Sequence, residues 1–108
     1  MKKQTTIRLP KKLVNNLDSL SDNLGFTRSD LIKSAVLKYL VSDKLEGFQE
    51  ITSGSGEVIR TGIYFNENLK GILSRQAKAN NTSINALVIY SASKTYEYYS
   101  KLLKELGC

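Results

Sequence analysis

The feature that most constrains the fold of this chain is an internal repetition of its apolar residues. When the sequence is shifted by 56 positions, apolar residues of two distant segments coincide without a gap for about 35 positions. Ile7 and Leu17, for example, fall on Ile63 and Leu73. Self-similarity at a fixed offset is typical of a repeated structural unit. The sequence therefore predicts two copies of one small unit within 108 residues.

Each unit is expected to open with a short strand. Residues 4–9 (QTTIRL) and 58–65 alternate in polarity, and this period of two is typical of a strand with one buried face. Pro10 ends the first strand and suits the start of a helix. The outward-facing sets are expected to be Gln4, Thr6 and Arg8 in the first strand, and Arg60, Gly62 and Tyr64 in the second.

Two helices are expected after each strand. In the first unit, leucines recur at helical spacing over residues 13–24, and Gly25 suits a left-handed C-cap. Thr27 then begins a second helix with the cap sequence T-x-x-D.

The helices of the second unit follow the same order. Asn66 and Ser83 are the expected N-caps, and the last helix is expected to run to about Leu106. Gln76 and Asn80 stand where the first unit has leucines, which predicts a weaker apolar stripe.

Neither unit is long enough to fold alone, because chains of about 40 residues rarely bury a sufficient core. The expected solution is an antiparallel pairing of the two strands over four helices. We therefore predict a mainly α fold with a two-stranded antiparallel β-ribbon, forming one pseudo-symmetric domain. Its parts are residues 1–41, a linker over residues 42–56, and residues 57–108 with an extended last helix.

The charge of the chain favours a polyanionic partner. Lysine and arginine exceed the acidic residues by 6, and the excess lies in residues 1–44 and 57–108. The chain has no histidine, only scattered carboxylates and a single cysteine, Cys108. This composition favours neither an enzyme nor a metal site, and we expect no cofactor. No apolar run is long enough for a membrane span or a signal peptide, so a cytoplasmic location is expected.

The order strand, helix, helix resembles the ribbon–helix–helix family of Arc/MetJ-type DNA-binding regulators. The resemblance is carried by TTIRLPKKLVNNLDSLSDNLGFTRSDLIKSAV and GIYFNENLKGILSRQAKANNTSINALVIYSA. Proteins of this family usually dimerise to build the ribbon, whereas this chain is expected to supply both strands itself, as a tandem two-unit member.

The resemblance implies a role for particular residues. Outward strand side chains would contact bases in the major groove, and the start of each second helix would contact phosphate. The implied base-reading residues are Gln4, Thr6, Arg8, Arg60, Gly62 and Tyr64. The implied phosphate contacts are Lys2, Lys3, Thr27, Arg28, Ser29, Ser83 and Asn85.

The implied function is sequence-specific binding of double-stranded DNA, foremost as a transcriptional repressor on a nucleoid or plasmid. Two alternatives remain open: an accessory protein of DNA mobilisation that binds near a transfer origin, and the DNA-binding antitoxin of a toxin–antitoxin pair. The last helix has an apolar face beyond what the short units need, and we expect it to mediate self-association. That face consists of Tyr96, Tyr99, Leu103 and Leu106.

Overall fold

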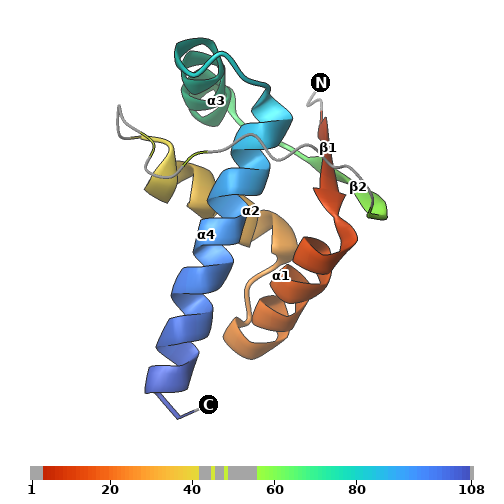
Figure 1. Cartoon of the computed structure of the whole chain (residues 1–108), viewed down its shortest axis with the longest axis vertical. Coiled ribbons are helices and arrows are strands. Elements are labelled where there is room, and N and C mark those ends of the chain that lie inside the picture. Colours follow the sequence, from red (N-terminus) through yellow and green to blue (C-terminus); the bar gives the residue numbers. More distant parts are fainter. Residues whose placement is uncertain (1–3, 42–44, 46–47, 49–55, 108) are drawn as a thin grey trace.

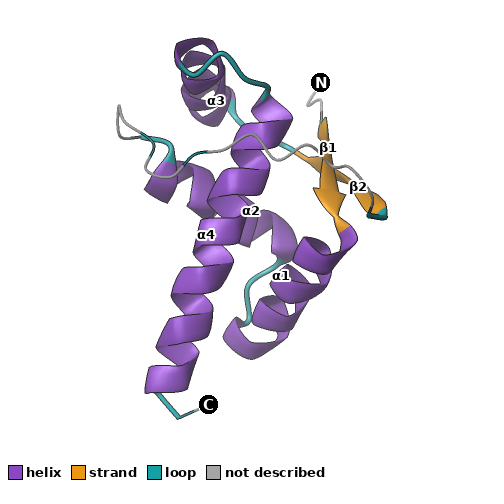
Figure 2. Cartoon of the chain, in the orientation of Figure 1, coloured by secondary structure: helices purple, strands orange, loops and turns teal. Residues whose placement is uncertain are grey.

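The computed structural model describes residues 4–41, 45, 48 and 56–107, and it is mostly helical with one two-stranded sheet (Figures 1 and 2). The expected mainly α fold with an antiparallel ribbon is therefore confirmed. In chain order the elements are β1 (Thr5–Pro10), α1 (Lys11–Leu24), α2 (Arg28–Tyr39), β2 (Val58–Ile63), α3 (Glu67–Ala79) and α4 (Ile84–Glu105).

The two strands pair antiparallel within one chain. Thr6 lies opposite Gly62 and Arg8 lies opposite Arg60. The alternation expected from the sequence holds on both strands: the inward face carries the buried residues Ile7, Leu9, Thr61 and Ile63. The ribbon therefore turns one face to the core and the other to solvent.

The ends of the strands differ slightly from the expected ones. Pro10 is still paired, opposite Val58, because the main chain continues the ladder until the Lys11 N–H donates to the Glu57 carbonyl at 2.9 Å. At the other end, β2 stops at Ile63, although Phe65 remains buried at 1% exposure.

The helix starts are fixed by the cap residues that the sequence indicates. The side chains of Thr27, Asn66 and Ser83 accept hydrogen bonds from main-chain N–H groups three residues later, at 2.9 to 3.0 Å. Gly25, at φ 77°, ends α1 in the left-handed conformation, and Asn81 takes a similar φ of 52° between α3 and α4.

Helix α4 is the centre of the packing. It contacts α1, α2, α3 and β1, and the segment from Ala86 to Ala92 is buried throughout. A helix that is buried on all sides lies inside a core rather than on its surface. In Figure 1 the ribbon lies at one edge of the molecule, and both α1 and α4 contact it.

Helix α3 carries a polar side chain at a buried position. The sequence predicts a weaker apolar stripe at Gln76, yet this side chain is only 2% exposed. Its Nε2 donates to the Leu40 carbonyl at 2.8 Å, and its Oε1 accepts from Asn80 Nδ2 at 3.0 Å. Gln76 thus joins α3 to the end of α2 through a buried hydrogen bond, which an apolar pattern does not reveal.

Most of the expected linker, residues 42–56, lies outside the described residues. Leu45 and Phe48 are described, and both pack against the core. The Phe48 ring meets the Tyr90 ring edge to face, with centroids 5.3 Å apart. This part of the connection therefore belongs to the packed structure.

Candidate nucleic-acid interface

The solvent face of the ribbon brings together the six residues that the sequence predicts to read bases. Five of them are exposed, and Tyr64 is half-buried at the edge of β2. The surface consists of Gln4, Thr6 and Arg8 from the first strand segment, and Arg60, Gly62 and Tyr64 from the second. We call these six residues the ribbon face.

Two arginines dominate the charge of the ribbon face. Arg8 and Arg60 are direct partners across the two strands, and both are exposed. Like charges directly opposite one another destabilise a sheet. An anion bound between or beside these guanidinium groups would relieve that repulsion.

The Asn85 side chain, near the start of α4, holds the outer edge of β1. The main-chain N–H of Arg8 donates to Asn85 Oδ1 at 2.7 Å, and Asn85 Nδ2 donates to the Arg8 carbonyl at 2.9 Å. Both main-chain groups of Arg8 therefore point away from β2, so Arg8 and Arg60 form a non-hydrogen-bonded pair. In such pairs the Cα atoms are only about 4.5 Å apart and the side chains are close.

This bracing role of Asn85 is not expected from the sequence, which implies only a phosphate contact. No local signal reveals it, because the bonded residues are 77 positions apart in the chain. The consequence is that the start of α4 sits against the ribbon edge beside Arg8. Free N–H groups and the positive end of the helix dipole at such a start favour anions.

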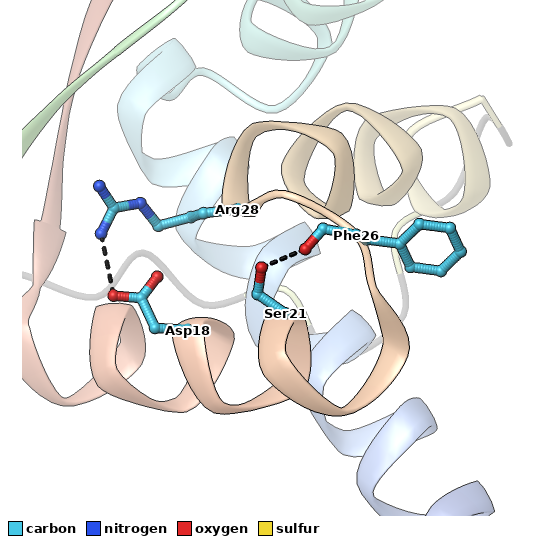
Figure 3. A network of polar contacts seen from close by, with 4 residues as sticks. All are labelled: Asp18, Ser21, Phe26 and Arg28. Atoms are coloured by element: carbon cyan, nitrogen blue, oxygen red, sulfur yellow. Dashed lines mark hydrogen bonds and ion pairs between the residues drawn. The ribbon is translucent and has the colours of Figure 1, made fainter.

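The start of α2 carries three of the predicted phosphate contacts, Thr27, Arg28 and Ser29. Thr27 caps this helix, and Arg28 extends to Asp18 on α1, with Nη1 3.3 Å from Oδ2 (Figure 3). The hydroxyl of Ser21, near the end of α1, donates to the carbonyl of Phe26 in the loop between α1 and α2, as Figure 3 also shows. The Arg28–Asp18 pair is solvent-exposed, and exposed pairs stabilise a fold by at most about 1 kcal/mol. Loss of this ion pair would therefore destabilise the fold only slightly.

The structure gives less information on the remaining predicted residues. Lys2 and Lys3 lie outside the described residues. Of the apolar face expected on α4, Tyr96, Tyr99 and Leu103 pack partly against the core of the same chain. Leu106 is 66% exposed. Self-association through this face stays a prediction.

Two other kinds of feature are absent among the described residues. These residues contain no group of three histidine, cysteine or acidic side chains able to hold a metal ion. None of their helices is long and apolar enough to span a membrane.

A two-stranded antiparallel ribbon with a pair of helices after each strand defines the class of ribbon–helix–helix proteins. Residues 3–42, which include β1, α1 and α2, match the family model described as "Ribbon-helix-helix protein, copG family". This match assigns residues 3–42 to the ribbon–helix–helix family. Its members bind DNA, typically to regulate transcription, and are in general not enzymes. No curated protein and no solved structure matches the chain.

Proposed function

We propose that this protein binds double-stranded DNA at a specific sequence with its ribbon face in the major groove, and that it acts as a transcriptional repressor. The observation that carries the proposal is the Arg8–Arg60 pair on the solvent face of a ribbon whose other face is buried. A two-stranded ribbon fits the major groove, where every base pair shows a distinct pattern of donors and acceptors.

The ribbon face carries side chains suited to reading that pattern. Arginine bonds guanine O6 and N7 in a bidentate manner, and glutamine does the same with adenine. Threonine donates or accepts a hydrogen bond and contacts the thymine methyl group. The proposed base-reading residues are therefore Arg8, Arg60, Gln4 and Thr6, and Tyr64 lies at the edge of this group.

Phosphate contacts are proposed at the starts of α2 and α4. Asn85 already uses its side chain on Arg8, so its proposed contribution is its main-chain N–H. Thr27, Arg28, Ser29 and Ser83 would hold the flanking phosphates, together with Lys2 and Lys3. Contacts of this kind fix the position of a protein on DNA, while the strand side chains specify the sequence.

The two halves are proposed to be tandem units of one pseudo-symmetric domain, with residues 1–41 and 57–108 joined by residues 42–56. The ribbon register supports this division. A shift of 56 positions places Thr6 on Gly62, and these two residues are also direct partners across the ribbon. A twofold axis relating two such units would pass through this pair. Because the halves carry different side chains, the preferred DNA site should not be a palindrome. Selection of bound sequences from a random pool tests this, and a clean palindrome would contradict it.

The experiment that tests DNA reading compares Arg8→Ala with two variants that remove the same charge. Arg8→Ala should weaken binding to the selected site by about 1–3 kcal/mol and relax preference at one base pair. Lys3→Ala should weaken binding to all duplexes alike and reduce the salt slope by about one unit. Arg75→Ala, at an exposed position of α3, should have little effect. If Arg8→Ala and the parent bound every duplex equally, the ribbon would not be the reading element.

A further inference from the structure

Gly62 occupies the middle of the ribbon face, at a position where its partner Thr6 has a side chain. Its φ lies outside the range that favours glycine, so the backbone does not explain this residue. The space above Gly62 explains the absence of a side chain. A Cβ atom built on Gly62 would lie 2.6 Å from Gln4 Oε1 and 3.2 Å from Gln4 Cδ.

The Gln4 carboxamide therefore lies directly over the main chain of Gly62. Gln4 and Thr6 face the same side of the ribbon, and Gln4 reaches diagonally across to the second strand. Diagonal neighbours in a sheet are about 7–8 Å apart, which a long side chain can span. The other glycines that the structure describes have no such neighbour: a Cβ on Gly71 of α3, for example, would meet nothing within 4 Å.

We propose that Gly62 is a positioning residue for Gln4, and that its missing side chain holds the Gln4 carboxamide over the centre of the ribbon face. This inference rests on the proposed DNA binding. The first half of the chain would then read the base pair at the ribbon centre, at the point where the second half offers only main chain. A glutamine fixed in this way is suited to adenine, which it bonds through N6 and N7.

Substitution of Gly62 is a clean test because the atoms in conflict are the far end of a flexible side chain. In Gly62→Ala the Gln4 carboxamide must move, while the strand itself has no reason to shift. The matched control is Gly71→Ala, the same change in open space. Circular dichroism of both variants should match that of the parent.

The experiment is a double-mutant cycle read out as base preference at each position of the selected DNA site. Gly62→Ala and Gln4→Ala should each reduce the preference for adenine at the same single position by about tenfold. The double variant should lose no more than either single variant, because both changes remove one contact. Losses that add, or losses at different positions, would overturn the inference.

A second readout needs no DNA. The side-chain amide resonances of Gln4 should shift in Gly62→Ala and stay unchanged in Gly71→Ala. Unchanged resonances in both variants would overturn the positioning role even if the protein binds DNA specifically. If the parent protein bound all duplexes equally, the proposed function would be refuted. The proposed contact of Gln4 with adenine would then be refuted as well.

Discussion

The buried hydrogen bond of Gln76 leads to the sharpest stability prediction. Replacing Gln76 by glutamate keeps the size of the side chain and leaves an oxygen to accept from Asn80. The change replaces the Nε2 donor, which bonds the Leu40 carbonyl at 2.8 Å, by an oxygen that cannot donate when the carboxyl is ionised. At neutral pH a carboxylate would face that carbonyl at a site only 2% exposed.

The expected cost follows from these contacts. Loss of a hydrogen bond to a buried carbonyl costs about 1–3 kcal/mol, and burial of a charge beside that carbonyl raises the total to about 3–5 kcal/mol. Single domains are stable by only about 5–15 kcal/mol, so Gln76→Glu should be folded but strongly weakened at pH 7. The same change at exposed Gln4 should stay within about 0.5 kcal/mol of the parent.

The pH dependence of stability distinguishes a buried charge from a general packing defect. Burial raises the pKa of the introduced carboxyl above its unfolded value of about 4.3, because it disfavours the charged form. Below that value the carboxyl is neutral in both states and can donate to the Leu40 carbonyl. The penalty should therefore be small at pH 4 and grow as the pH rises toward the raised folded-state pKa.

The assay is urea unfolding followed by circular dichroism, with the variant and the parent compared at the same pH. A penalty at pH 7 that shrinks by about 2 kcal/mol or more at pH 4 would agree with the structure, since each unit of pKa shift corresponds to about 1.4 kcal/mol. An equal loss of unfolding free energy at both pH values, or no loss at either, would contradict a buried hydrogen bond from Gln76 Nε2 to the Leu40 carbonyl.

Two further predictions concern the ribbon. Asn85→Ala removes both hydrogen bonds to the Arg8 main chain, so it should lower the free energy of unfolding by about 1–2 kcal/mol. The control Asn68→Ala, on α3, should leave the free energy of unfolding unchanged. Equal urea midpoints for the two variants would contradict the bracing role of Asn85. Thr61→Val should stabilise the protein by about 1 kcal/mol, because the Thr61 hydroxyl is buried without a partner among the described residues. Thermal unfolding should show a rise of about 4–8 °C, and a fall would indicate that the hydroxyl is bonded.

The expected elements depend on local patterns, which is why most of them are present in the structure. Alternation marks the inward residues Ile7 and Ile63, and the caps Thr27, Asn66 and Ser83 begin their helices as expected. These signals act between residues that are at most a few positions apart, so a single sequence contains them.

Contacts across the fold could not be read in the same way. Gln76 looks like a gap in an apolar stripe until the Leu40 carbonyl is seen beside it. From the sequence alone, Gly62 is a position of the ribbon face with no side chain to contact a base. The structure places the Gln4 carboxamide above it. In both cases the neighbour comes from another element, and polarity patterns give the face of a residue but not its partner.

The two strands, the helix pairs and the basic outward face of the ribbon follow from the sequence alone, because each depends on local spacing and charge. The packed fold, in contrast, places Arg8 opposite Arg60 and brings Asn85 against the main chain of Arg8. The physical reason is distance along the chain. A register and a bond across 77 positions depend on how the helices pack beneath the ribbon, and no local preference encodes that packing.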